Sequence, residues 1–147
     1  MQINEFRIFT PEEFEELKEI EKQTENHFGY VYFAEYGKYI KIGRTKKIYN
    51  RMFALRSQAK NYSECGFGRM AISPKCTNYK KLEKLFHEHF KKYRKEGTEL
   101  FDISFYDAIY EILGTDFPFL DESKIIEEKE IKLSESLKNY VLTGHLN

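Results

Sequence analysis

The sequence lacks the features that mark membrane, secreted and disulfide-stapled proteins. No apolar run approaches the roughly 18 residues that a membrane-spanning helix needs, and residues 1–10 do not show the charged and then apolar pattern of a signal peptide. The two cysteines, Cys65 and Cys76, are not spaced as C-x-x-C, which favours free thiols in a reducing compartment over a disulfide framework. There is also no internal repeat. These absences predict a soluble, cytoplasmic protein that does not contact a membrane.

The chain also lacks net charge, since 24 Lys and Arg balance 24 Asp and Glu. This balance hides a strong asymmetry along the chain. Residues 37–95 carry 17 basic and 3 acidic residues, whereas residues 1–36 carry 3 basic and 9 acidic ones and residues 96–147 carry 4 basic and 12 acidic ones. A basic segment with so few compensating acids favours contact with nucleic acid, and the two acidic arms lie outside it.

Apolar residues make up 41% of the chain and aromatic residues 16%, which is enough for a folded core.

The acidic N-terminal arm has the sequence pattern of a helix. Thr10 followed by Pro11 and Glu13 has the pattern of a capped helix start, and glutamates cover most of the helical surface up to about residue 24. This pattern predicts an acidic surface helix packed along one edge of the domain.

The basic middle of the chain shows the periods of both strands and helices. Aromatic and β-branched residues on either side of a turn at Gly37 predict a hairpin of strands over 30–34 and 39–43. The apolar spacing further on predicts a basic helix over 46–59, a strand over 66–73 and a second helix over 78–95.

The last third of the chain is acidic and mainly helical in pattern. It predicts a short extended piece at 99–103, a helix at 104–113, a linker at 115–120 and a long acidic helix at 121–142. The sequence as a whole therefore predicts an α+β fold, with a central three-stranded antiparallel sheet flanked by helices and an acidic helix at each end. We expect an acidic helical arm over 1–28, the main domain over 29–103 and a helical C-terminal extension over 104–147.

The hairpin and the helix after it carry the most specific motif. The segment GYVYFAEYGKYIKIGRTKKIYNRM, residues 29–52, resembles the opening of a GIY-YIG nuclease domain. Tyr30-Val31-Tyr32 takes the place of the first motif and Lys41-Ile42-Gly43 that of the second. Arg51 follows Gly43 by eight residues, which is the spacing of the catalytic arginine of the family.

The resemblance continues to residue 103. Glu83, followed by His87, resembles the helix that supplies the metal-binding glutamate of the family. Glu99-Leu100-Phe101 resembles the E-W-F ending of one branch, the phage open-reading-frame and meiotically up-regulated-gene type, which also has K-I-G in the second motif. The resemblance implies a GIY-YIG-like fold and a metal-dependent endonuclease that hydrolyses DNA and leaves 5′-phosphate and 3′-hydroxyl ends.

The residue types suit this chemistry. Glu83 is expected to hold Mg²⁺ or Mn²⁺ with waters completing the coordination shell, and the planar guanidinium of Arg51 matches the paired oxygens of a phosphate. Tyr32 and Lys41 lie on paired strands, where Lys41 could deprotonate Tyr32 or a water. His87 lies one helical turn after Glu83, where it could assist the leaving group or serve the structure alone.

The basic surface predicts where DNA would lie, although single-stranded, duplex and branched DNA are not distinguished. The expected nucleic-acid-binding residues are Arg44, Lys46, Lys47, Arg56, Lys80 and Lys84. The tyrosines among these basic residues could stack on bases, and they are Tyr49, Tyr62, Tyr79 and Tyr93. The acidic arms could be solvated helices, could mediate self-association, or could compete with DNA for the basic surface.

Two alternatives stand beside the nuclease. Lys41 replaces the tyrosine of the second motif, Leu55 stands where the superfamily often has His or Tyr, and the terminal Asn motif is missing. These departures motivate a catalytically weak or inactive nucleic-acid-binding or regulatory protein, such as a phage accessory factor, on the same scaffold. A zinc site formed by Cys65, Cys76, His87 and His89 is disfavoured, because the spacing matches no common zinc finger.

Overall fold

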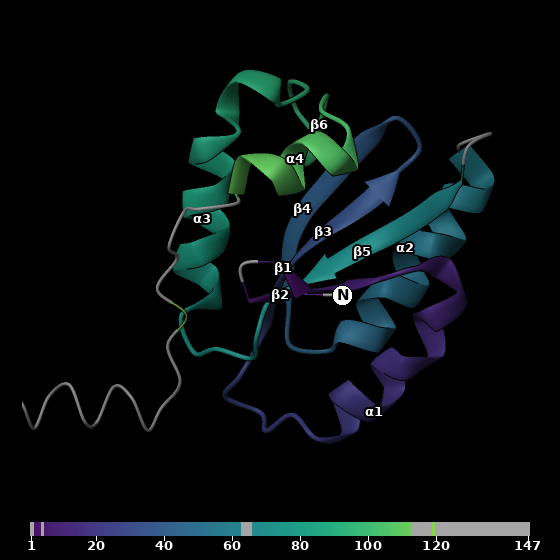
Figure 1. The fold of residues 1–147 in the computed structure, drawn as a ribbon, viewed down its shortest axis with the longest axis vertical. Helices are drawn as coiled ribbons and strands as arrows, with labels where there is room; N and C mark the ends of the chain where they lie inside the picture. The colour runs from purple at the N-terminus through teal and green to yellow at the C-terminus, as the bar shows by residue number, and fades with distance from the viewer. Residues whose placement is uncertain (1, 4, 63–65, 113–118, 120–147) are drawn as a thin grey trace, which may run out of the picture.

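In the part of the chain that the structure describes, the fold is an antiparallel sheet of six strands covered by helices on both faces (Figure 1). It is seen in a computed structural model that describes residues 2, 3, 5–62, 66–112 and 119. The strands are β1 (Gln2–Ile3), β2 (Phe6–Phe9), β3 (Tyr30–Tyr36), β4 (Tyr39–Thr45), β5 (Phe67–Ile72) and β6 (Leu100–Phe101). They lie in the order β1-β2-β5-β3-β4-β6, and each neighbouring pair is antiparallel.

The helices connect the strands. A 3₁₀ helix, η1, precedes the first α-helix, and a short 3₁₀ helix, η2, follows the third. The helices are η1 (Pro11–Glu16), α1 (Leu17–Lys22), α2 (Ile48–Tyr62), α3 (Tyr79–His89), η2 (Lys91–Tyr93) and α4 (Phe105–Ile112). In Figure 1, α1 and α2 lie on one side of the sheet, and α3 and α4 lie on the other.

Alternation along the strands divides the interior into two cores. In β3, Val31 and Phe33 point to the face covered by α3 and α4, while Tyr30, Tyr32 and Ala34 point to the face covered by α1 and α2. On the first face, Phe33 meets Phe86 of α3 at 5.2 Å between ring centroids, nearly edge to face. The central strand is therefore buried on both faces, which explains its nearly continuous apolar sequence.

The sequence-based prediction of an α+β fold with an antiparallel sheet is confirmed, and the sheet extends beyond its three central strands. The β3–β4 hairpin runs in register from Tyr30↔Thr45 to Tyr36↔Tyr39, and Gly37 takes the positive φ of 64° that this tight turn requires. On the far side of the sheet, β2 pairs with β5 through Phe9↔Met70 and its neighbours. At the other edge, β6 pairs with β4.

Two helices differ in their limits from the sequence patterns. The N-terminal helix begins as a 3₁₀ turn, with the capping box in place, since the Thr10 backbone N–H donates to Glu13 Oε1 at 3.0 Å. The α3 helix ends at His89, well before residue 95, because Arg94 takes an extended conformation and forms a β-bridge with Phe101.

The helix expected at 121–142 lies outside the described residues. Among the described residues, no helix has the length and hydropathy to cross a lipid bilayer.

An ion pair ties β3 to β5 and gives the fold a pH dependence. The Arg69 side chain donates to both carboxylate oxygens of Glu35 at 3.1 Å, and these hydrogen bonds lower the pKa of Glu35 below its ordinary value of 4.5. Because the folded-state pKa is lowered, the stabilisation is present above pH 4.5 and is lost as the pH falls below it. We expect urea unfolding to show a smaller loss of stability between pH 6 and pH 3 for Glu35→Gln than for the wild type. Parallel losses would exclude this contribution.

Candidate active site

A polar pocket of about 250 Å³ collects side chains from five parts of the chain. Its lining residues are Tyr32 of β3, Gly43 and Arg44 of β4, Arg51 of α2, Glu83 of α3, and Glu99, which precedes β6. The pocket therefore joins the two motif strands, the predicted phosphate-binding arginine and the predicted metal-binding glutamate, although these residues are far apart in the sequence.

The floor of the pocket is made by Tyr32 and Gly43, which lie directly opposite each other on β3 and β4. The Tyr32 ring lies across Gly43, so that a Cβ atom at position 43 would stand 2.6 Å from Tyr32 Cζ and even closer to the hydroxyl oxygen. The glycine is needed here for space, because its φ is not positive. Gly43 thus leaves the space that the hydroxyl end of the Tyr32 ring occupies at the pocket.

Substitution of Gly43 tests this arrangement. Gly43→Ala is expected to destabilise the fold by about 1–3 kcal/mol, the usual cost of overpacking, and to displace the Tyr32 ring from the pocket. Urea unfolding measures the cost. The matched control is the same change in a Tyr32→Ala background, where no ring opposes the new methyl group, and the added cost should largely disappear. An equal cost in both backgrounds would show that the clash is elsewhere.

The Tyr32 hydroxyl is protonated at neutral pH. The side chain is only 1% exposed, and this burial raises the pKa of Tyr32 well above its ordinary value. The nearby Arg51 lowers that pKa, but the carboxylates of Glu99 and Glu83 raise it again. In this environment Tyr32 is a hydrogen-bond donor toward the pocket and a poor proton acceptor.

Glu83 faces the pocket because of the helix that carries it. Leu82 and Phe86 of α3 are buried against the sheet, which leaves Glu83 at the border of that contact with 17% of its side chain exposed. Its Oε1 lies 3.5 Å from Arg44 Nε. The pocket thus contains two guanidinium groups and two carboxylates, an arrangement that can hold both a phosphate and a cation.

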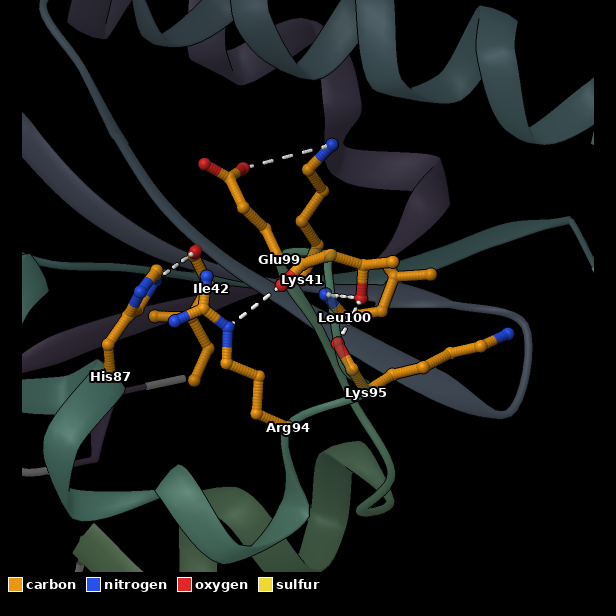
Figure 2. Close-up of polar contacts among 8 residues, drawn as sticks. Lys41, Ile42, His87, Arg94, Lys95, Glu99 and Leu100 are labelled. Atoms are coloured by element: carbon orange, nitrogen blue, oxygen red, sulfur yellow. Dashed lines mark hydrogen bonds and ion pairs between the residues drawn. The ribbon is translucent and has the colours of Figure 1, made fainter.

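Lys41 is not among the residues that line the pocket, and it reaches the pocket only through Glu99. Its ammonium Nζ lies 4.0 Å from Glu99 Oε2, as Figure 2 shows. The cation that acts on the Tyr32 hydroxyl is Arg51, and the neighbours of Lys41 do not place it at that hydroxyl. The sequence-based prediction that Lys41 deprotonates Tyr32 or a water stays a prediction. The geometry favours Lys41 as the partner of the Glu99 carboxylate.

Glu99 lines the pocket, although it is not among the residues that the sequence predicts for the site. The signal for it was present in the Glu99-Leu100-Phe101 match, but the pairing that brings Glu99 to the pocket joins residues far apart. Leu100 pairs with Lys41 across β6 and β4, and this register places Glu99 beside the second motif.

A role for His87 in assisting the leaving group stays a prediction, and the described residues give its ring a structural contact. Its Nε2 lies 2.8 Å from the backbone oxygen of Ile42, and its ring lies 5.2 Å from that of Phe101 (Figure 2). His87 does not line the pocket. It instead links α3 to β4 behind the site, where it can hold the second motif in place.

The zinc alternative finds no support in the described residues. Cys76 is buried with its Sγ 3.7 Å from the Gly29 carbonyl oxygen, and His89 lies 3.6 Å from Glu111. Cys65 lies outside the described residues. No group of three or more His, Cys, Asp or Glu suited to a metal ion occurs in the part of the chain that the structure describes.

A second pocket of about 440 Å³ adjoins the first through Arg51, which lines both. It is lined by Thr45, Lys46, Lys47, Asn50, Arg51 and Ala54. Its charged lining is entirely basic, in contrast to the mixed lining of the first pocket. Two of the predicted DNA-binding residues, Lys46 and Lys47, are therefore next to the candidate active site.

The other predicted DNA contacts are placed differently. Lys80 and Lys84 lie exposed on α3, whereas the Arg56 guanidinium lies 3.9 Å from the centre of the Phe14 ring. Tyr79 is buried and Tyr93 donates a hydrogen bond to Glu111, so neither is placed as an open stacking platform. The Tyr62 side chain is outside the described residues.

The residues present fit a hard divalent cation. Mg²⁺ usually binds through one or two carboxylates, with waters and substrate phosphates completing its shell. Glu83 offers a carboxylate within a polar pocket that also contains arginines for a phosphate. A site of this kind needs no larger cluster of protein ligands.

The chain belongs to the T5orf172 domain family. The sequence model of that domain matches residues 29–115, which is more than half of the chain. This phage-type domain is related to the GIY-YIG and HNH-like nucleases. The relation agrees with the resemblance of the sequence to the phage open-reading-frame branch. The match begins where the nuclease-like domain was predicted to begin and includes α4. No curated protein and no solved structure gives a significant match.

Proposed function

We propose that the protein is a metal-dependent endonuclease of GIY-YIG type that hydrolyses phosphodiester bonds in DNA. The observation that carries this proposal is the convergence of Tyr32, Arg51 and Glu83 on one polar pocket. Their order and spacing in the sequence match the nuclease motifs, and the family to which the chain belongs is nuclease-like.

Each of these side chains has a role that its chemistry supports. Arg51 binds the non-bridging oxygens of the scissile phosphate and stabilises the charge that develops on them. The protonated Tyr32 hydroxyl is available as a hydrogen-bond donor in the same pocket. Glu83 would hold Mg²⁺ or Mn²⁺, which would supply Lewis-acid stabilisation of the developing charge.

The basic second pocket supports DNA as the substrate. Arg51 joins the two pockets, so a strand whose scissile phosphate lies at Arg51 passes next to Lys46 and Lys47. These cations, with Lys80 and Lys84 on α3, favour a phosphate backbone over a small neutral substrate.

Self-association through the acidic arms stays a separate prediction, tested by measuring the mass in solution with and without residues 115–147.

One observation favours the alternative of a DNA-binding protein without catalysis. Arg44 lies 3.5 Å from Glu83 and so competes with a cation for its carboxylate. If that ion pair persists in the complex with DNA, Glu83 cannot hold a metal, and the fold serves binding alone. Salt-sensitive binding of DNA without metal-dependent cleavage would support this alternative.

The test is a cleavage assay on labelled single-stranded, duplex and branched DNA with Mg²⁺ or Mn²⁺. We expect at least one of these substrates to be cut into products with 5′-phosphate and 3′-hydroxyl ends, which a ligase and a terminal transferase can detect. Products with other end groups would contradict the proposed chemistry, and binding of all three without cleavage would favour the alternative.

A further inference from the structure

The loop before β6 presents one carboxylate to the candidate active site. Glu99 lines the pocket with Tyr32, Arg51 and Glu83, and half of its side chain is exposed. The function considered so far gives this group no role. A carboxylate held against a phosphate-binding site costs affinity through repulsion, so its presence calls for a chemical reason.

The loop that carries Glu99 is fixed by its own hydrogen bonds. Arg94 Nε donates to the Thr98 carbonyl oxygen at 2.9 Å, and the Lys95 backbone N–H donates to the Leu100 oxygen at 2.8 Å (Figure 2). The Thr98 hydroxyl accepts from the Leu100 N–H at 3.1 Å and donates to the Lys95 oxygen at 2.8 Å. These bonds close the loop on both sides of Glu99 and hold its backbone in place.

The Glu99 side chain is held by a cation from outside the pocket. Figure 2 shows Glu99 and Lys41 extending side by side from the loop and from β4, with Nζ and Oε2 4.0 Å apart. The other charged or titratable groups around the pocket are Tyr32 from β3, Arg44 from β4, Arg51 from α2 and Glu83 from α3. Lys41 thus directs Glu99 without occupying the space where a substrate phosphate would lie.

Among these groups, Glu99 is the best placed to accept a proton. Burial keeps Tyr32 protonated, Arg44 and Arg51 are permanent cations, and Glu83 is engaged by Arg44 or by a metal ion. Lys41 lies behind the carboxylate. We propose that Glu99 is the catalytic general base, which takes a proton from the attacking water, and that Lys41 is a positioning residue for it. This inference rests on the proposed nuclease function and names the base of that reaction.

The water oxygen forms a bond to phosphorus as one of its protons moves to the Glu99 carboxylate. The bond between phosphorus and O3′ breaks, and O3′ leaves with the electron pair and takes a proton from solvent. Glu99 then returns its proton to solvent. The products are a 5′-phosphate and a 3′-hydroxyl, and no redox reagent is needed.

Removal and chemical replacement of the carboxylate test the proposal. At saturating DNA, Glu99→Ala is expected to lower kcat by about 10²- to 10⁴-fold. Added formate or acetate should restore part of the rate, with acetate, the stronger base, more effective at equal occupancy. Glu99→Gln fills the space and should not be rescued. An effect within about twofold, or a loss that no carboxylate restores, would overturn the role of Glu99 as the base, while wild-type cleavage would still support the proposed function. If the wild type cleaves no DNA, the proposed function fails, and this inference fails with it.

A binding measurement without turnover separates catalysis from structure. In EDTA, Glu99→Gln should bind labelled DNA at least as tightly as the wild type, because a negative charge beside the phosphate has been removed. Weaker binding would show that Glu99 supports the pocket structurally, and it would overturn the proposal. Lys41→Met should lower kcat with little change in KM, and Lys41→Arg should restore most of the loss. Equal effects of the two Lys41 variants would contradict its role in positioning Glu99.

Discussion

Replacement of Glu83 by glutamine is expected to abolish metal-dependent cleavage of DNA. The change keeps the shape of the side chain and removes the charge that a divalent cation needs from the protein. Lewis-acid stabilisation contributes several kcal/mol to such reactions, so we expect cleavage to fall by about 10³-fold or more. Binding of Mn²⁺, followed by electron paramagnetic resonance in the presence of DNA, should be lost together with cleavage.

Glu88 provides the matched control for Glu83. It lies on the same helix, α3, is exposed, and pairs only with Lys91 at 3.8 Å among the contacts of the described residues. Glu88→Gln therefore removes the same charge from the same helix outside the pocket, and cleavage should stay within about twofold of the wild-type rate, as for most exposed substitutions. Loss of Mn²⁺ binding in both variants would contradict the assignment of Glu83.

Replacement of Arg51 by alanine is expected to have the second largest effect. Arg51 lines both the mixed pocket and the basic pocket, so under the proposed function its loss removes the guanidinium that would contact phosphate in each. We expect the single-turnover rate of cleavage of bound DNA to fall by about 10²- to 10³-fold, the cost of losing one preorganised donor to a developing oxyanion. Arg51→Lys should restore little, because an ammonium lacks the planar pair of donors.

Arg56→Ala is the control for the loss of a charge from the same helix. Its guanidinium lies over the Phe14 ring and lines neither pocket. The variant should bind DNA no more tightly than the wild type, and it should cleave bound DNA at the wild-type rate. A similar fall in the rate of both variants would mean that Arg51 acts through general electrostatics and not through direct contact with the phosphate.

The central part of the fold could be predicted because its signals are local. The β3–β4 hairpin, α2 and α3 follow from periodicity and from a turn at Gly37, and all of them begin close to the expected residues, although α3 ends earlier than predicted. Arg51 and Glu83 both line the pocket, as the motif predicts. The spacing of a residue along a helix sets which face it lies on and so whether its side chain meets the strands.

The β1–β2 edge of the sheet could not be predicted from the same signals. β1 and β2 contain two and four residues, too few for an alternating pattern to stand out. β1 pairs with β2, and β2 is placed by its pairing with β5 and by the burial of Phe6 and Phe9, which are contacts with residues far along the chain. Such short strands are stabilised by pairing and packing with distant residues, which local sequence patterns do not identify.

The roles of single side chains were harder to predict than their neighbourhoods. Lys41 and Glu99 form a pair only because β6 adds to β4, and His87 turns to the backbone oxygen of Ile42 instead of to the pocket. Tyr79 lies in a basic stretch of sequence but packs against Gly29 in the interior. Position along the chain predicts the face of an element, whereas the partner of a side chain depends on tertiary pairing.

The most direct test of the account is cleavage of one labelled DNA substrate by the wild type and by Glu83→Gln, purified in parallel, each with Mg²⁺ and with EDTA. We expect cleavage only in the reaction of the wild type with Mg²⁺, where the products carry 5′-phosphate ends, and none in the other three reactions. Equal cleavage by both proteins, or cleavage by the wild type in EDTA, would contradict a metal-dependent active site at Glu83.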